Sequence, residues 1–314
     1  MTPNLSFPIF IDSTMLNDFR LCEQKWAWRY LHHLVPASPN VHLNAGGAFA
    51  KGLEIARRSF YEQGQSQEDS VALGLKALLE AYGDTQDESG KKTWEAVSGA
   101  LIYYCDNHPF ASDHLQPFVI DGKATIEFSG AIPLPLNHPQ TGEPLLYSVR
   151  FDMLATHQHL DAKRAFCVDE KTGGSINPGW AVKWPLRGQF LGYIWFCQEQ
   201  GYDIAGAIIR GIAINKNKYE LVEVPIFGGP WKIKEWHDGM LETVGNMIRV
   251  WKEVCEAKSR SFVKALNDAC TMYEEARRPL SGCSYIRLCD SQKPELWMEP
   301  YFERREWNPI RLGE

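Results

Sequence analysis

The sequence lacks the features that mark membrane-spanning, secreted and repetitive proteins. No apolar run approaches the roughly 18 residues that a transmembrane helix needs. The N-terminus has neither a basic segment nor a small-residue cleavage site, so we expect no secretory signal and a cytoplasmic protein. Internal repeats and low-complexity tracts are also missing. Hydrophobic residues make up 44% of the 314 residues and aromatic residues 12%, which is typical of a folded protein with a sizeable core.

Two further absences narrow the chemistry. No glycine-rich phosphate loop follows a strand, because Gly46 and Gly47 belong to no G-x-G-x-x-G pattern and no G-x-x-x-x-G-K-[ST] occurs. This argues against P-loop and Rossmann enzymes. A basic excess is also missing, since 39 acidic and 33 basic side chains give a net charge of −6. That charge disfavours a basic nucleic-acid scaffold, but it is compatible with an enzyme in which an acidic metal site lies beside a basic groove.

Hydrophobic periodicity predicts a helical N-terminal part followed by mixed strands and helices. Helices are expected at 13–33, 47–62, 68–82, 90–107, 184–201 and 234–258. Strands are expected at 118–136, with a turn at Asp121-Gly122, and at 145–158, 165–172, 203–216 and 219–226. This order predicts an α/β fold with a mixed central sheet flanked by helices, not a doubly wound parallel sheet.

The most informative residues lie in two successive predicted strands. Asp152 interrupts the apolar segment RFDM, and Asp169 and Lys171 stand two residues apart in VDEKTGG. Side chains two apart on a strand share a face, so Asp169 and Lys171 are expected to point the same way. If the strands form a hairpin, Asp152 approaches Asp169. Two carboxylates so close together need a cation to offset their repulsion, and Mg²⁺ or Mn²⁺ suits oxygen ligands of this kind. The alternative, common for an isolated D-x-K, is two strand-end carboxylates and a solvated lysine.

Five sequence blocks occur in an order known from one nuclease superfamily. They are IDSTMLNDFRLCEQKWAWRYL, GGAFAKGLE, VRFDML, VDEKTGG and RGQFLGY, and together with cysteines near the end they span about 12–290. The chain thereby resembles the PD-(D/E)XK nucleases, on the RecB/AddB-like exonuclease branch and closest to phage and prophage members. The resemblance implies a restriction-endonuclease-like core and a metal-dependent DNA exonuclease of phage-type recombination, repair or end processing.

The resemblance also implies an organisation and partners. Residues 1–314 would be one nuclease domain, with a helical part at 1–117, the α/β catalytic core at 118–258 and an extension at 259–314. The substrate would be DNA ends or single strands, and a recombination protein is a possible partner. If the protein is phage-encoded, it would be located in the cytoplasm of the bacterial host.

Site residues follow from the same resemblance. Asp152 and Asp169 would bind Mg²⁺ or Mn²⁺, and Lys171 would be the catalytic lysine. Gln189 and Tyr193, one helical turn apart, would line the site or contact DNA. For Tyr193, packing in the core is an equal alternative.

One position departs from the family pattern. The metal-binding histidine of the family is replaced here by Lys51. Glu127 or Glu54 is therefore expected to complete the metal shell, with equal weight, although Glu54 is also spaced to pair with Arg58. If neither serves, the chain would be a weakly active or inactive relative that binds DNA or another protein.

The eight cysteines divide into two groups. Four lie in apolar or helical surroundings and are expected to be inert core residues: Cys105, Cys167, Cys197 and Cys255. The resemblance implies that Cys22, Cys270, Cys283 and Cys289 hold a structural 4Fe–4S cluster, with zinc or free thiols as alternatives. An iron–sulfur redox protein unrelated to nucleases is a further hypothesis.

Basic and aromatic residues suggest DNA contacts. The candidates for a basic groove are Arg57, Arg58, Lys91, Lys92, Lys183, Arg187, Arg210, Lys216 and Lys218. Trp180 and Trp184 lie just after the predicted catalytic strand and could stack on unpaired bases, but packing is the favoured interpretation.

Overall fold

Two units make up the chain in the computed structural model. The structure describes residues 5–37, 41–83, 92–159, 164–215, 218–267, 270 and 283–310, with only the backbone at 41–43. Unit 1 comprises Met1–Ser38, Gly130–Val149 and Lys234–Glu314, and unit 2 comprises Pro39–Ser129 and Arg150–Ile233. The single nuclease domain over 1–314, with its three parts, stays a prediction.

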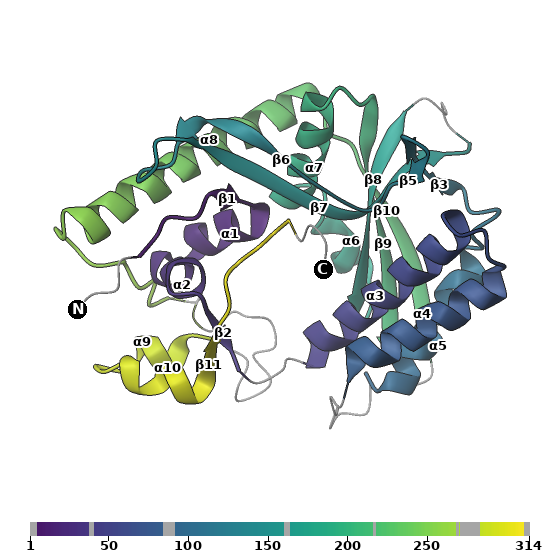
Figure 1. Cartoon of the computed structure of the whole chain (residues 1–314), viewed down its shortest axis with the longest axis horizontal. Helices are drawn as coiled ribbons and strands as arrows, with labels where there is room; N and C mark the ends of the chain where they lie inside the picture. The colour runs from purple at the N-terminus through teal and green to yellow at the C-terminus, as the bar shows by residue number, and fades with distance from the viewer. Residues whose placement is uncertain are drawn as a thin grey trace. The chain divides into compact units, whose positions relative to one another are not determined.

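A mixed seven-stranded sheet has the order β1-β7-β8-β9-β10, and β3 and β6 also pair with β7 (Figure 1). Its strands are β1 (Phe10–Ile11), β3 (Leu115–Pro117), β6 (Ile126–Asn137), β7 (Pro144–His157), β8 (Ala165–Gly173), β9 (Ile204–Asn215) and β10 (Lys218–Ile226). β7 is antiparallel to β8, β8 is parallel to β9, and β9 is antiparallel to β10. The sheet is therefore mixed, as predicted.

Helices cover both faces of β8 in unit 2. They are α3 (Val41–Tyr61), α4 (Gln67–Tyr82), α5 (Trp94–Asn107), α6 (Pro178–Val182) and α7 (Gly188–Glu199). Asp169 of β8 reaches α7 through Tyr193, whereas the next residue, Glu170, reaches α3 through Arg57. Because consecutive strand residues face opposite ways, α7 and α3 lie on opposite faces. The predicted α/β class, with helices flanking a mixed sheet, is confirmed.

Two glycines bring α3 and α4 close together. A Cβ on Gly52 would lie 2.9 Å from the carbonyl oxygen of Gly74, and a Cβ on Gly74 would lie 2.6 Å from that of Gly52. Larger residues would therefore separate the helices. Leu53, Leu78 and Leu101 complete a buried core between α3, α4 and α5. This packing holds α3, which carries the candidate metal ligand Glu54, against the sheet.

The predicted helix over 13–33 is interrupted at Cys22. α1 (Ser13–Leu21) ends there, and α2 (Glu23–Trp26) and a π-helical turn, η1 (Ala27–Leu31), follow. Cys22 itself is extended, with φ −167° and ψ 116°. Apolar spacing continues across the break, so periodicity did not reveal it. α3 also begins at Val41, not at 47 as predicted.

The other elements are short, apart from one long helix. They are β2 (Leu34–Pro36), β4 (Val119–Ile120), β5 (Lys123–Ala124), α8 (Pro230–Trp251), η2 (Lys252–Glu256), α9 (Ile286–Cys289), α10 (Glu295–Tyr301) and β11 (Phe302–Arg304). Asp121 and Gly122 join β4 to β5 with φ values of 50° and 78°, which confirms the predicted turn. In the described parts of the chain, no helix combines the length and apolarity that a membrane crossing requires.

Candidate active site

The β7–β8 hairpin brings the acidic motif residues together. Met153 pairs with Val168 across the antiparallel strands, so Asp152 and Asp169 follow on adjacent strands. A carboxylate oxygen of Asp152 accepts a hydrogen bond from the backbone N–H of Glu170 at 2.5 Å. Nζ of Lys171 forms an ion pair with Oδ1 of Asp169. Two carboxylates and one lysine therefore lie at the same end of this pair of strands.

Helix α7 supports Asp169 through a chain of two hydrogen bonds. The hydroxyl of Tyr193 donates to Oδ2 of Asp169 at 3.4 Å, and Nε2 of Gln189 donates to the Tyr193 hydroxyl at 2.6 Å. Tyr193 is buried, and its ring lies 5.0 Å from that of Phe151. Tyr193 thus contacts a candidate metal ligand and packs in the core, and Gln189 is linked to Asp169 through Tyr193.

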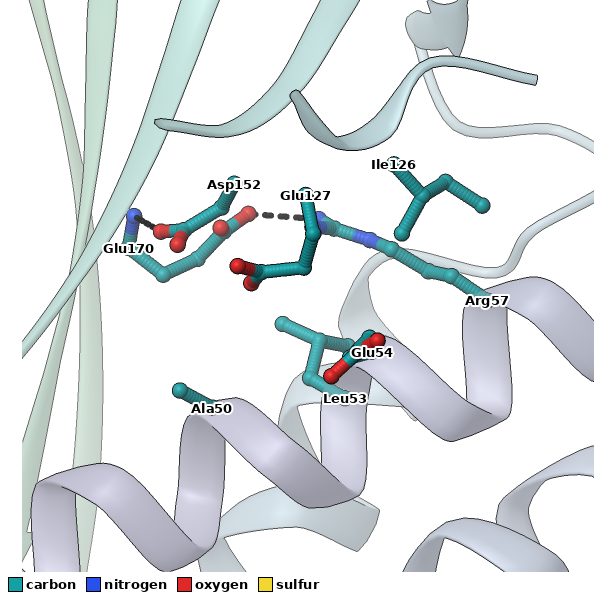
Figure 2. A pocket seen from close by; sticks show the side chains of 8 residues that line it. All are labelled: Ala50, Leu53, Glu54, Arg57, Ile126, Glu127, Asp152 and Glu170. Atoms are coloured by element: carbon teal, nitrogen blue, oxygen red, sulfur yellow. Dashed lines mark hydrogen bonds and ion pairs between the residues drawn. The ribbon is translucent and has the colours of Figure 1, made fainter. Parts of the chain in front are cut away.

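A small acidic cavity lies between α3 and the strands. Its volume is about 10 Å³, and four carboxylates line it, those of Glu54, Glu127, Asp152 and Glu170 (Figure 2). The side chain of Arg57 also lines the cavity. A space of this size accommodates a single water molecule or a small ion.

Both candidates for the additional metal ligand line this cavity, and each is paired with basic residues. Glu54 binds Nζ of Lys51 at 3.0 Å and Nε of Arg58 at 3.1 Å. Glu127 binds Nε of Arg150 at 3.0 Å. Glu127 also has a φ of 52°, a left-handed conformation that is rare for a non-glycine residue inside a strand. Such strain is concentrated at functional sites, where it redirects a side chain.

Sequence reasoning missed the ion pair that anchors the centre of β8. Nη2 of Arg57 donates to Oε1 of Glu170 at 2.5 Å, and the Tyr104 hydroxyl donates to the same oxygen at 2.9 Å. Burial acts to raise the pKa of Glu170, but the Arg57 guanidinium outweighs it and lowers that pKa to about 2. No local sequence signal links Glu170 to Arg57, because the two residues are 113 positions apart.

Two of the arginines predicted to form a DNA-binding groove are buried. Arg57 pairs with Glu170, and Arg210, which is 1% exposed, donates two hydrogen bonds of 2.6 Å to the Asp113 carboxylate and one to Glu223. The groove prediction is wrong for both arginines, because their charges are satisfied inside the fold. Among the other candidates, Lys92 is also buried, Arg58 pairs with Glu54 and Glu62, and Lys91 and Lys216 lie outside the described residues.

The pKa values of the motif carboxylates reflect crowded negative charge. Burial, followed by the charges of Asp169, Glu170 and Glu127, raises the pKa of Asp152 well above its ordinary value. Burial also raises the pKa of Asp169, although Lys171 opposes this. Within the part of the chain that the structure describes, Oε2 of Glu170 is buried without a hydrogen-bond partner. Such a group of buried carboxylates is stabilised by a proton or a cation.

The donor set fits Mg²⁺ or Mn²⁺ in its chemistry. All the candidate ligands are carboxylates, and hard divalent cations prefer oxygen donors. Over the described residues, however, no three His, Cys, Asp or Glu side chains are already grouped to hold a metal. Glu54 and Glu127 are turned to basic partners instead. Metal binding would therefore exchange these ion pairs for metal ligation.

Unit 1 contains the four cysteines that the resemblance assigns to a cluster. The Cys22 thiol lies 3.8 Å from the carbonyl oxygen of Val263, and the backbone N–H of Cys283 donates to the carbonyl of Cys270. Burial raises the pKa of the Cys283 and Cys289 thiols, and the proximity of Cys22 raises both further. All four are free thiols in one neighbourhood, and in the described segments no three of them are already arranged around a metal position.

Comparisons with known proteins find similarity among solved structures. No protein-family model and no curated protein matches the chain. A protein of Eubacterium rectale described as a "putative exonuclease" is similar over 90% of this chain and 93% of its own, with 12% identity and a TM-score of 0.48. The crystal structure of SSO0001 is similar over 81% of this chain and 89% of its own, with 11% identity and a TM-score of 0.31. At such low identity, these similarities transfer no activity to this chain.

Proposed function

We propose that this protein is a metal-dependent DNA nuclease with a site of the PD-(D/E)XK type. The observation that carries the proposal is the convergence of Asp152, Asp169 and Lys171 at one end of the β7–β8 hairpin. A small cavity beside Asp152 is lined by three further carboxylates. Buried carboxylates that repel each other favour a hard cation. The sequence blocks that resemble this superfamily imply the same set of residues.

The metal ligands in this proposal are Asp152 and Asp169, with Glu54 or Glu127 as a further ligand. When bound, Mg²⁺ or Mn²⁺ supplies an activated water and neutralises charge on the departing oxygen of a phosphodiester. The protein itself positions the carboxylate ligands. The backbone N–H of Glu170 orients the Asp152 carboxylate, so that the two strands present their carboxylates together.

The lysine and the α7 residues have supporting roles. Lys171 is half-buried, and although loss of hydration lowers its pKa, the charge of Asp169 outweighs this and raises the pKa, so the ammonium form is favoured. A positive charge at this place offsets negative charge that develops on the attacked phosphate. Gln189 and Tyr193 hold Asp169 through their hydrogen bonds, and this fixes the direction of its carboxylate.

The finer proposal is an exonuclease of the RecB/AddB-like branch that acts at DNA ends in phage-type recombination or repair. The order of the five sequence blocks supports it. The protein would act in the cytoplasm, in a bacterial host if it is phage-encoded, with a recombination protein as its partner.

Digestion of end-labelled linear DNA tests the nuclease proposal. The protein, purified without oxygen, is incubated with single- and double-stranded substrates in Mg²⁺ or Mn²⁺, with a chelator as control. We expect metal-dependent release of label from linear DNA and no cleavage of a covalently closed circle. Cleavage of the circle would contradict the exonuclease assignment. Absence of any cleavage by folded protein would contradict the nuclease.

A second candidate is a DNA-binding protein without turnover. Lys51 occupies the place of the family histidine and pairs with Glu54 at 3.0 Å, and no metal-ready group of three side chains occurs within the described ranges. This candidate predicts that the protein binds DNA with equal affinity in chelator and in Mg²⁺, and that it releases no label in the same assay.

We also propose that Cys22, Cys270, Cys283 and Cys289 hold a 4Fe–4S cluster, with zinc as the alternative. Four thiolates suit either group. The separation of Cys22 from the other three along the chain supports a structural role, because a bound cluster would tie the opening helices to the C-terminal extension. Hydrolysis of a phosphodiester needs no electron transfer.

Replacing Cys283 with serine is expected to remove the bound metal, because one of four thiolates is lost. Wild type purified without oxygen should carry about four iron atoms per chain, or about one zinc if zinc is the resident metal. Elemental analysis and visible absorption measure this. Cys255→Ser is the matched control, since Cys255 lies in η2 and belongs to the other cysteine group, and its metal content should equal wild type. Equal metal content in both variants would contradict the assignment.

A further inference from the structure

The connection between β8 and α7 exposes two aliphatic side chains. Val182 and Leu186 are each 75% exposed, although they are only four residues apart and Trp184, midway between them, is buried. Single exposed aliphatic residues are common on protein surfaces. Two of them on one short segment are a candidate contact surface, provided that the backbone beneath them is held in place.

A pair of buried tryptophans holds this segment. The rings of Trp180 and Trp184 are 5.0 Å apart in an edge-to-face arrangement, and Trp184 also packs against Phe190 of α7 at 5.8 Å. Trp180 lies over Gly211 of β9, where a Cβ would overlap its ring. The Asn177 side chain accepts a hydrogen bond from the backbone N–H of Trp180 at 3.0 Å. The tryptophans therefore anchor the segment, and Val182 and Leu186 point outward from it.

The charge on this segment has one sign. Residues 173–198 contain Lys183 and Arg187 and no aspartate or glutamate, in a chain whose net charge is −6. Both cations are exposed, and they lie over the Trp184 ring, with Nζ of Lys183 at 4.4 Å and the Arg187 guanidinium at 5.3 Å from its centroid. The surface formed by 182–187 therefore combines apolar side chains with positive charge, and it suits an anionic partner that also has apolar faces.

Chain connectivity places this surface beside the candidate active site. The segment leaves β8 directly after the strand that carries Asp169 and Lys171. It ends at Arg187, the N-cap of α7, and Gln189 follows in the first turn of that helix. Contacts link the two in space as well, because Trp184 packs on Phe190, Phe190 packs on Tyr193, and the Tyr193 hydroxyl donates to Asp169. A partner bound at 182–187 is thus close to the residues to which the proposed chemistry belongs, all within unit 2.

We propose that the 182–187 surface binds the end of a DNA strand, with Val182 and Leu186 against an unstacked terminal base and Lys183 and Arg187 on the adjacent phosphates. This rests on the proposed function and specifies how the substrate is held. Nucleobases expose their apolar faces only where stacking ends, and aliphatic side chains contact bases in this way. Phosphates supply the matching negative charge.

Binding to DNA with a fluorescent base tests this. Duplexes carry 2-aminopurine either at the terminal position or in the interior, and all titrations are done in chelator so that no cleavage occurs. Wild type should raise the fluorescence of the terminal probe and leave the internal probe unchanged. The Val182→Ser/Leu186→Ser variant should lose this response and bind linear DNA about tenfold more weakly, a loss of about 1.4 kcal/mol, because the apolar contact with the terminal base is removed.

Two controls separate the contributions. The affinity of the serine variant for a covalently closed circle should equal that of wild type, because a circle offers no terminal base. Lys183→Gln should weaken binding to linear and circular DNA alike and reduce the dependence of affinity on salt, because it removes a phosphate contact. Equal thermal unfolding of all variants shows that the fold is intact.

The outcomes distinguish this proposal from the nuclease proposal. If the serine variant binds linear DNA as wild type does, the surface is not an end-binding site, even if the protein cleaves DNA. If the terminal probe responds in wild type alone and no metal supports cleavage, end binding stands and the nuclease does not. A third outcome would overturn the proposal: the wild type self-associates as its concentration rises, the serine variant does not, and the terminal probe gives no response. The surface would then bind a second copy of the chain.

Discussion

Replacing Lys171 by methionine is expected to lower the rate of metal-dependent DNA hydrolysis by at least about 100-fold, the usual effect of removing a positioned catalytic group. The ammonium of Lys171 is paired with Asp169 and lies at the end of the β7–β8 hairpin where the two motif carboxylates meet. Methionine keeps the length of the side chain but removes its charge. The rate of label release from linear DNA, measured at saturating substrate, checks the prediction.

A matched lysine separates catalysis from general charge effects. Lys76 is exposed on α4, and Lys76→Met should cleave DNA at the wild-type rate. The Lys171→Met variant should still bind DNA in chelator, since its expected defect is in turnover. If it cleaves as fast as Lys76→Met, Lys171 is not catalytic. If neither variant nor wild type cleaves, the non-catalytic alternative is favoured.

Replacing Arg210 by methionine is expected to lower the free energy of unfolding by about 3–5 kcal/mol, the usual cost of removing one partner of a buried ion pair. Arg210 is 1% exposed, and the side chain of its partner Asp113 is 5% exposed. The substitution leaves the largely buried Asp113 carboxylate without its arginine partner. Urea denaturation followed by circular dichroism measures the change.

The same substitution at Arg187 is the control. Arg187 is exposed, and Arg187→Met should change the free energy of unfolding by no more than about 0.5 kcal/mol. A second variant, Arg210→Met with Asp113→Leu, should recover part of the lost stability, because the buried Asp113 charge is removed and the other partner of Arg210, Glu223, is partly exposed to water. If Arg210→Met is instead as stable as wild type and binds DNA more weakly, the result would support the predicted role of Arg210 in a DNA-binding groove.

Local pattern was sufficient for the motif strands. The two-residue spacing of Asp169 and Lys171 predicted their common face, and the approach of Asp152 to Asp169 was expected if the two strands form a hairpin. The structure has this hairpin, with Met153 opposite Val168. Such features are predictable because side-chain alternation and a short connection determine strand pairing without information from distant segments.

Pairings between distant segments were not predictable. Arg57 and Glu170 are 113 residues apart, and Arg210 and Asp113 are 97 apart. Both arginines were assigned to a solvent-exposed groove, because most arginines are exposed and neither partner was known. The break at Cys22 was missed for a related reason, since the apolar spacing that predicts a helix continues through it.

The sequence by itself determined the α/β class, the order of its elements and the neighbourhood of Asp152, Asp169 and Lys171. Only the tertiary structure decided which charged and aromatic side chains are buried. It placed Trp180 and Trp184 in the interior and left Val182 and Leu186 in solvent. The physical reason is that periodicity is a property of neighbouring residues, whereas burial depends on which remote elements pack against them. The free-energy cost of burying a charged side chain depends in turn on whether those elements supply an oppositely charged partner.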